Sequence, residues 1–252
     1  MTGWAVTLLV QGYPGKALEN GGLGWSSVAL ARGPEGRVAV LDTGGSGLRR
    51  TLVQRLRDAG VEPADVTDLL LSHLHYDHCE NWPLFRNATL HVRAAELDWA
   101  LALPEDDSLV PVHVVRALAA TGRVATFGAD AAPLPGIAAC DTPGHSPHHV
   151  SFVVQGGPET VIFAADAAKN LAELVSGEAD LTMDAAASRG SIARLAALWA
   201  GEPDALFIPG HDLPLRRDAS GTIRRVGARR AGIGAVLGAD LADVTRFALD
   251  GA

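Results

Sequence analysis

The segment Ser72-His73-Leu74-His75-Tyr76-Asp77-His78 brings three imidazoles and one carboxylate together within six residues. Imidazole nitrogens and carboxylate oxygens are ligands that suit zinc and similar divalent ions. His73 and His75 can point the same way from an extended turn, whereas Asp77 and His78 diverge from them, so one short loop can address two metal ions. This spacing arises by chance with a probability on the order of one in a thousand, which makes the alternative of a solvated polar loop the weaker one.

The residues around this cluster predict where it lies in the fold. Val66–Ser72 ends in an apolar run suited to a buried strand, and the histidines follow it directly. Three further turns place one His or Asp after a strand candidate. They are Asp141-Thr142-Pro143-Gly144-His145, Ala164-Ala165-Asp166 and Ile208-Pro209-Gly210-His211. We expect these turns to supply the remaining ligands of the site.

Hydrophobic periodicity predicts strands and helices in both halves of the chain. The first half shows β-rich runs separated by turns, which predict an antiparallel meander over Trp4–Val10, Ser26–Ala31 and Arg37–Leu41. A helix with one apolar face follows from Leu48 and ends at Gly60. The second half predicts strands over Gly136–Ala139, His149–Val154 and Thr160–Ala164 and a helix over Ser188–Ala200. This order fits a sheet sandwich covered by helices on both sides.

No repeat or low-complexity linker separates the two halves. The stretch Gly128–Pro135 is the one plausible soft boundary, and it is short enough to be a surface loop. A length of 252 residues is ample for one α/β domain with its own hydrophobic core. We therefore expect a single domain over residues 1–252, in which any metal is functional and is not needed to hold the fold together.

Charge and cysteine content restrict the classes of binding partner and the cellular compartment that we expect. The chain has 21 Lys and Arg against 29 Asp and Glu, a net charge of −8, which disfavours long nucleic acids as partners. Cys79 and Cys140 are too few for a disulfide framework, and a reducing cytoplasm fits them best. No run approaches the ~18 apolar residues of a membrane span, and no signal-peptide pattern is present. We expect a cytoplasmic protein with a small-molecule substrate and no membrane partner, and a homo-oligomer stays open.

The motifs from Asp42 to His211 resemble those of the metallo-β-lactamase-fold hydrolases, which carry H-x-H-x-D-H, a His in a TPGH-like turn, a bridging Asp and a late GH. The resemblance implies an αββα sandwich of two mixed β-sheets flanked by helices. It also implies two divalent metal ions, with Zn as the first choice and Mn, Fe or Co as alternatives. One ion would be held by His73, His75 and His145. The second would be held by Asp77, His78 and His211, with Asp166 bridging the two.

Several other residues are candidates for supporting roles. Asp42 matches the family position that supports the metal site by hydrogen bonding near the histidine loop, although an ordinary turn residue is the alternative. His148 or His149 could orient the site or the substrate, or could face solvent. Tyr76 is a candidate substrate contact that could instead pack beneath the loop. Cys79 is interpreted as a small buried residue and not as a ligand.

Two divalent ions that share a water lower its pKa and polarise the oxygen of a scissile carbonyl or phosphoryl group. The predicted reaction is hydrolysis by a metal-bridging hydroxide, with Asp77 as the catalytic group that holds the water and passes a proton to the leaving group. The His-Leu-His-Tyr-Asp-His form resembles quorum-quenching lactonases and related esterases, which implies a small lactone, ester or related carbonyl substrate. Many acyl-homoserine lactonases place a Tyr after the bridging Asp, and residues 167–200 contain none.

Two alternatives stay open. One is a phosphodiesterase of the same fold, because the compact metallo-β-lactamase-domain-containing protein 1 family has a similar length and a similar GTPGH-like layout, or a thioesterase, because glyoxalase II-like thioesterases of the fold use a basic C-terminal region. The basic stretch Arg216–Arg230 could serve such a substrate or be a solvated surface. The other is a non-enzymatic metal-binding module, which is less favoured because structural zinc sites are usually closed by four ligands.

Overall fold

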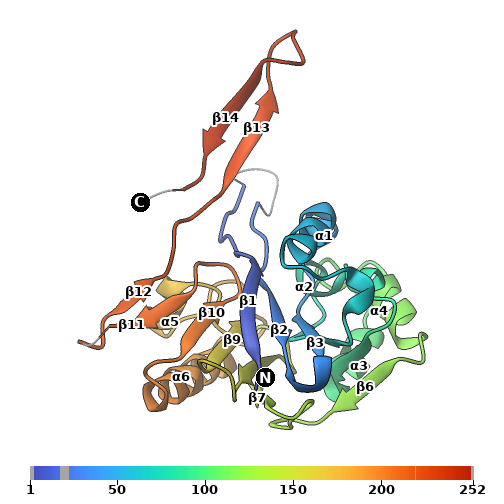
Figure 1. Ribbon diagram of the computed structural model, residues 1–252, viewed down its shortest axis with the longest axis vertical. Helices are drawn as coiled ribbons and strands as arrows, with labels where there is room; N and C mark the ends of the chain where they lie inside the picture. The colour runs from blue at the N-terminus through green and yellow to red at the C-terminus, as the bar shows by residue number, and fades with distance from the viewer. Residues whose placement is uncertain (1–2, 18–22, 219, 251–252) are drawn as a thin grey trace.

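The structure is a computed structural model that describes residues 3–17, 23–218 and 220–250. Its first sheet holds six strands in chain order, β1 to β6 (Figure 1). They are Ala5–Val10, Val28–Arg32, Val38–Leu41, Asp68–Leu70, Thr89–Arg93 and Val124–Phe127. β1, β2 and β3 pair antiparallel, which confirms the predicted meander, and β3 to β6 pair parallel.

The second sheet also holds six strands, in the order β12, β11, β10, β9, β8, β7. In chain order β7 to β12 are Ile137–Asp141, Val150–Val154, Val161–Ala165, Leu206–Pro209, Leu215–Arg217 and Ile223–Arg225. β9 and β10 are parallel, and the other pairs are antiparallel. The soft boundary over 128–135 links β6 to β7, which are edge strands of the two sheets.

Six α-helices accompany the sheets in the described part of the chain. The helices α1 to α6 are Arg49–Asp58, Tyr76–Cys79, Ala94–Leu101, Val112–Ala119, Leu171–Ser176 and Ala185–Gly201. Short 3-10 turns lie at Pro34–Gly36, Ser46–Leu48, Pro63–Asp65 and Trp82–Leu84. No helix among the described residues is long and apolar enough to cross a membrane.

The fold has four layers, which are helices, the first sheet, the second sheet and helices. Three layers of buried side chains lie between them. Strand alternation sends Val28 and Leu30 towards α1, α3 and α4, and sends Ala29 and Ala31 into the space between the two sheets. There the small alanines face Phe152 and other large side chains of the second sheet. The third layer packs the outer face of the second sheet against α5 and α6. The predicted αββα sandwich of two mixed sheets flanked by helices is therefore confirmed (Figure 1).

Some element boundaries differ from the expectation, and some elements were not predicted. α6 begins three residues before the predicted start because the Asp184 side chain accepts hydrogen bonds from the N–H groups of Ala186 and Ala187 and caps the helix there. The sequence patterns do not predict the strands β5, β11 and β12, the helices α2 to α5 or a C-terminal hairpin. The hairpin consists of β13, Gly232–Val236, and β14, Val244–Ala248, and projects from the body of the molecule (Figure 1).

Candidate metal centre

The predicted ligands lie at the carboxyl ends of strands from both sheets. His73, His75, Asp77 and His78 follow β4, where the chain turns into the short helix α2. The other three follow strands of the second sheet. They are His145 after β7, Asp166 after β9 and His211 after β10. Strand ends are where the backbone leaves the sheet, so side chains from distant parts of the sequence meet there.

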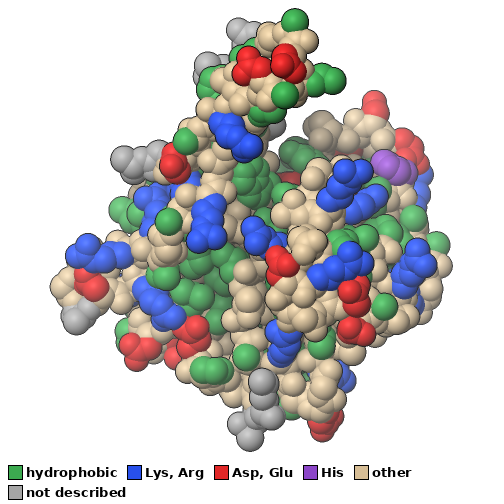
Figure 2. Space-filling model, turned by 45° about the horizontal axis from the view of Figure 1, so that its top comes forward, with side chains coloured by type: hydrophobic (Ala, Val, Ile, Leu, Met, Phe, Trp, Pro, Cys, Tyr) green, Lys and Arg blue, Asp and Glu red, His purple; other side chains and the backbone are tan. Residues whose placement is uncertain are grey.

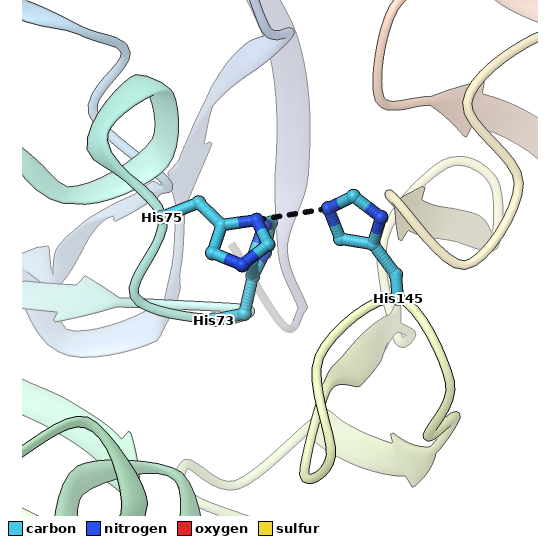
Figure 3. Close-up of side chains that lie close together, drawn as sticks. All are labelled: His73, His75 and His145. Carbon is cyan, nitrogen blue, oxygen red and sulfur yellow. Dashed lines mark hydrogen bonds between the residues drawn. The ribbon is translucent and has the colours of Figure 1, made fainter. Parts of the chain in front are cut away.

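The structure brings all seven side chains into one cluster. Their ligand atoms form three overlapping groups with every atom within 4.8 Å of the others in its group. The groups are His73, His75 and His145; His73, His78 and Asp166; and Asp77, His78 and His211. Figure 3 shows the first group, in which His75 Nδ1 lies 3.0 Å from His145 Nε2. The first and third groups are the two ligand sets that the resemblance implies.

Asp166 lies between the two sets. Its Oδ1 lies 3.1 Å from His78 Nε2, and its Oδ2 lies 3.1 Å from His145 Nε2 and 3.3 Å from His211 Nε2. Asp77 Oδ2 lies 3.3 Å from His211 Nε2. The Asp166 carboxylate thus faces one His of the first set and two of the second, which is the arrangement that a bridging ligand requires.

Unpaired polar atoms in the cluster fit a cation site. His73 Nε2, His75 Nε2, His78 Nε2 and Asp166 Oδ1 are buried and have no partner with hydrogen-bond geometry among the described residues. A buried polar atom without a partner costs free energy, and such atoms are rare in native structures. Nitrogen and carboxylate oxygen atoms that converge in this way suit zinc and similar divalent ions, so the residues present fit a metal centre.

Burial and mutual charge set the protonation of the cluster. Burial and the neighbouring His78 hold the pKa of His73 well below its usual value, and burial lowers the pKa of His75 to about 4. Burial opposes a charge on His78, but Asp166, Asp77 and Asp42 outweigh it and raise the pKa of His78 well above its usual value. Burial likewise opposes a charge on Asp166, and His211, His78 and His145 lower the pKa of that carboxyl well below its usual value. A bound cation would take the place of the proton that a charged His78 carries.

Asp42 is fully buried and orients histidines of both sets. Its Oδ2 lies 2.8 Å from His78 Nδ1 and accepts a hydrogen bond from the Ser72 hydroxyl at 2.7 Å. The same Ser72 oxygen lies 3.0 Å from His73 Nδ1. With the Nδ1 atoms engaged in this way, the Nε2 atoms of His73 and His78 are left to face the cluster. Asp42 is thus more than an ordinary turn residue.

His149, and not His148, makes contacts within the cluster. His149 is buried, its Nδ1 lies 2.9 Å from Thr142 Oγ1, and its Nε2 accepts a hydrogen bond from the backbone N–H of Asp166 at 3.2 Å. The acceptor role of Nε2 requires a neutral ring, and burial lowers the pKa of His149 to about 3. His148 is half-buried, and only its backbone N–H is recorded in a hydrogen bond, with Glu96. The geometry favours His149 for the positioning role.

Glu96, which no sequence motif marks, connects two of the ligand loops. It is 1% exposed on α3, and its Oε1 accepts a hydrogen bond from the Leu74 N–H at 3.2 Å. Its Oε2 accepts from the Ser146 hydroxyl at 2.9 Å and from the His148 N–H at 3.2 Å. Leu74 lies between two predicted ligands and Ser146 follows a third. Glu96 therefore braces the loop after β4 against the loop after β7.

The two Pro-Gly-His turns need glycine. A Cβ at Gly210 would lie 2.1 Å from Asp166 Oδ1, and a Cβ at Gly144 would lie 2.3 Å from the Ser188 hydroxyl oxygen. Gly144 also has φ +131°, which side-chain-bearing residues rarely adopt. Asp42 and Ala165 have positive φ as well, at 54° and 45°. Such conformations cluster where a site fixes its geometry at the expense of local stability.

A pocket of about 400 Å³ opens onto the cluster. Tyr76, Leu109 and Met183 are among its lining residues. Tyr76 is 41% exposed, so it does not pack beneath the loop. Burial and the adjacent Asp77 raise the pKa of its phenol, which stays a hydrogen-bond donor at neutral pH. Both lysines of the chain, Lys16 and Lys169, also line the pocket.

The remaining residues noted in the sequence lie elsewhere. Cys79 is buried in the hydrophobic core between the first sheet and its helices. The arginines of Arg216–Arg230 line no part of the pocket beside the cluster. Most of them have partners in the body, such as Glu159 for Arg216 and Asp212 for Arg225. This basic stretch is largely a set of internal ion pairs.

Comparison with known proteins gives the family. A mouse protein named metallo-beta-lactamase domain-containing protein 1 is 32% identical over 195 residues, which are 77% of this chain and 66% of that protein. An N-acyl homoserine lactonase from a Bacillus species is 27% identical over 169 residues, 66% of this chain and 64% of that protein. This chain thus spans about two thirds of the length of either relative.

The fold has close counterparts among solved structures. The dizinc quorum-quenching lactonase AidC, solved with N-hexanoyl-L-homoserine as its product, superimposes with a TM-score of 0.64 at 16% identity. The match covers 91% of this chain and 93% of that one. The model of the metallo-beta-lactamase superfamily matches residues 21–211, a range that contains every residue of the cluster, and the chain therefore belongs to that superfamily.

Proposed function

We propose that the protein is a hydrolase with two divalent metal ions that cleaves a small lactone, ester or related carbonyl compound. The observation that carries the proposal is the pair of ligand sets around Asp166 at the base of a pocket of about 400 Å³. A structural metal site is usually closed by four ligands, whereas this cluster offers seven and opens onto a pocket.

The proposed ligands are His73, His75 and His145 for one ion and Asp77, His78 and His211 for the other, with Asp166 between them. Bound divalent ions would supply Lewis acidity and an acidified water at neutral pH. We propose zinc first, by analogy with the dizinc lactonase, and Mn, Fe or Co as alternatives because the same donor atoms suit them.

Residues of the chain itself would position and protonate the substrate. Asp77 lines the pocket and turns Oδ2 towards His211, so its Oδ1 is free to hold the attacking water and to pass a proton to the leaving group. Tyr76 lines the same pocket with a protonated phenol, which can donate a hydrogen bond to a substrate oxygen. Asp42 and His149 would hold the ligands in place.

The pocket walls support a carbonyl substrate with an apolar portion. Leu109, Leu181 and Met183 line the pocket and give it an apolar wall beside its polar base. The similarity to an N-acyl homoserine lactonase supports a lactone. No Tyr occurs over residues 167–200, so we propose that the substrate differs from the acyl-homoserine lactones.

One observation favours a phosphodiester as the second candidate. Lys169, whose side chain is 11% exposed, places Nζ 2.9 Å from Glu173 Oε1 at the pocket wall, and Lys16 pairs with Asp180 at the more exposed side. Both lysines of a chain of net charge −8 thus line this pocket, each beside a carboxylate. They would favour a substrate that carries an anionic oxygen.

The test is a substrate panel on protein loaded with zinc or with manganese. Lactone and ester hydrolysis is followed by acid release and compared with hydrolysis of a chromogenic phosphodiester. His73→Ala and Asp166→Ala are expected to lose bound metal and activity together, and full activity in either variant would refute the proposal. His113→Ala is the matched control, because His113 is exposed on α4. Turnover of the phosphodiester alone would favour the second candidate.

The remaining proposals concern the compartment and the partners. Both cysteines are free and buried, which supports a reducing compartment, and we propose the cytoplasm. A small molecule is the proposed partner at the pocket. Localisation of a tagged full-length chain in its source cells tests the compartment.

A further inference from the structure

The C-terminal hairpin has no partner in the body among the residues that the structure describes. We call residues 232–248 the arm; it comprises β13, the connecting tip Leu237–Asp243, and β14. Within the described residues, no hydrogen bond joins the arm to the body, and no arm residue belongs to any of the three hydrophobic cores. Figure 1 shows the arm standing away from both sheets. An isolated two-stranded hairpin is at best marginally stable in water.

Both faces of the arm nevertheless carry apolar side chains. Ile233 pairs with Phe247 on one face, and these side chains are 38% and 47% exposed. Val236 pairs with Val244 on the opposite face, because alternate residues of a strand point to opposite sides. At the tip, Leu241 is 85% exposed. Exposed apolar side chains gathered on one element make that element a candidate contact surface for another molecule.

One edge of the arm is also unprotected. Natural edge strands are usually blocked by proline, by lysine or by a covering element. β13 has the sequence Gly-Ile-Gly-Ala-Val and carries no charge or proline, so its outer edge can pair with a further strand.

The base of the arm is fastened firmly and is basic. The guanidinium groups of Arg225 and Arg229 both bind the fully buried Asp212 carboxylate, Arg229 at 2.6 Å. The Arg230 backbone N–H donates to the Gln11 side chain at 3.3 Å, and the Arg230 side chain is exposed. The tip, in contrast, carries Asp240 and Asp243. Figure 2 shows the acidic side chains at the end of the arm and basic side chains towards its base.

A hollow lies at this base. It has a volume of about 630 Å³ and is lined by apolar groups, including Tyr13, Leu213 and Leu249, together with Arg225, Arg229 and Asp250. Its wall is shared with the pocket of the metal centre through Pro14 and Gly15. An apolar side chain flanked by carboxylates would fit such a hollow.

We propose that the arm is the dimerisation element of this protein, with a second copy of the chain as its partner. Two arms would lie side by side and antiparallel about a two-fold axis, so that the acidic tip of each reaches the basic base of the other. Each tip would seat Leu241 in the hollow of the other copy. A two-fold arrangement satisfies every such contact twice, which a single self-complementary surface allows.

The proposal accounts for features that a monomer leaves unexplained. The paired arms occupy the open edge of β13, and the opposite charges of tip and base fix the antiparallel direction. Because the hollow shares Pro14 and Gly15 with the pocket, the tip of the second copy would lie beside the entrance to the metal centre.

The first test is the mass of the full-length protein in solution, measured by light scattering during gel filtration over a range of concentrations. The expected mass is twice the 26.2 kDa of one chain. Leu241→Asp is expected to raise the dimer dissociation constant at least about tenfold, which is a loss of about 1.4 kcal/mol. Val175→Asp is the matched control, because Val175 is 67% exposed on α5 and lies outside the arm. A monomer at every concentration, or a dimer that Leu241→Asp leaves intact, would overturn the proposal.

The second test examines whether the two arms of the dimer run antiparallel. Arg230→Glu is expected to weaken the dimer, and combining it with Asp240→Arg is expected to restore it. The double variant Ala228→Cys with Ala242→Cys, one at the base and one at the tip, is expected to form a disulfide between two copies, since the native cysteines are buried. Failure of both the charge exchange and the cross-link would refute the arrangement. A monomer whose arm instead binds anionic lipid vesicles would overturn it as well.

Discussion

At the residue scale, the adjacent residues His148 and His149 differ in role, because only His149 positions a residue of the cluster. His149 holds the backbone N–H of Asp166, whereas only the backbone of His148 is recorded in a hydrogen bond. We expect His149→Ala to lower both metal affinity and kcat/KM by roughly 10- to 100-fold, as loss of a group behind a metal ligand usually does. His148→Ala should change either quantity less than about twofold. Competition with a chromogenic chelator measures the affinity, and equal effects of the two variants would contradict the assignment.

The unfolding free energy is expected to depend on pH through Glu96. Burial raises the pKa of Glu96 to about 7, from a usual value of 4.5. Between these values the folded protein binds more protons than the unfolded chain, so this carboxyl makes the unfolding free energy fall as the pH rises from about 5 to about 7. The contribution is at most about 3 kcal/mol.

Glu96→Gln removes this titration and isolates it from that of the histidines. The unfolding free energy of the wild-type protein minus that of Glu96→Gln is therefore expected to be larger at pH 5 than at pH 8. Urea unfolding in the presence of a chelator measures both values. A difference that does not change with pH would show that Glu96 is already ionised in the folded state.

Sequence spacing predicts ligands better than it predicts their supports. His73, His75 and His78 share one short motif, and their type and spacing are visible in the chain. Glu96 accepts hydrogen bonds from Leu74 and His148, which lie 22 and 52 residues away, through backbone N–H groups that carry no residue-specific signal. Contacts of this kind appear only once the loops are placed in space.

At the scale of elements, the Pro-Gly-His turn after β10 sets the distance between strand and ligand. A Cβ at Gly210 would collide with Asp166 Oδ1 and with the backbone of Ala165. We expect Gly210→Ala to displace His211 or Asp166, to lower metal content and to reduce kcat by at least about tenfold. Metal analysis of the purified protein together with kinetics checks this outcome.

Gly190→Ala is the matched control for Gly210→Ala. Gly190 lies inside α6, and a Cβ there meets nothing within 4 Å. Because alanine favours a helix over glycine, this variant is expected to gain roughly 0.5–1 kcal/mol of stability and to keep its activity. Similar losses in both variants would mean that general sensitivity to substitution, and not the turn, explains the effect.

The elements predicted from the sequence are those with a strong local pattern. The strands β1, β2 and β3 are separated by glycine- and proline-containing turns, and their boundaries were found within a few residues. β5 runs into α3 without an intervening turn, so the hydrophobic pattern changes from that of a strand to that of a helix with no turn residue to mark the boundary. The arm lacks the usual alternation, because Gly232 and Gly234 stand where one face would show side chains. Tertiary context decides such segments.

At the scale of the whole molecule, three hydrophobic layers make up the core of the fold. The two sheets share one layer, and each packs on its own helices through another. The cluster lies at the strand ends. The metal ions are thus expected to stabilise a fold that already exists.

Chelation tests this expectation and separates an enzyme site from a structural one. Ligands that bind only the folded state stabilise it by about 4 kcal/mol when the free ligand is a thousandfold above its dissociation constant. For a chain of this length that corresponds to a Tm change of roughly 10 °C. We expect the chelated protein to lose its activity and this part of its Tm. It is expected to keep its far-UV circular dichroism at room temperature and to unfold cooperatively at a higher temperature. If chelation instead unfolded the chain at 25 °C, the cluster would be a structural requirement, as in small zinc domains, because the hydrophobic layers alone would then be insufficient.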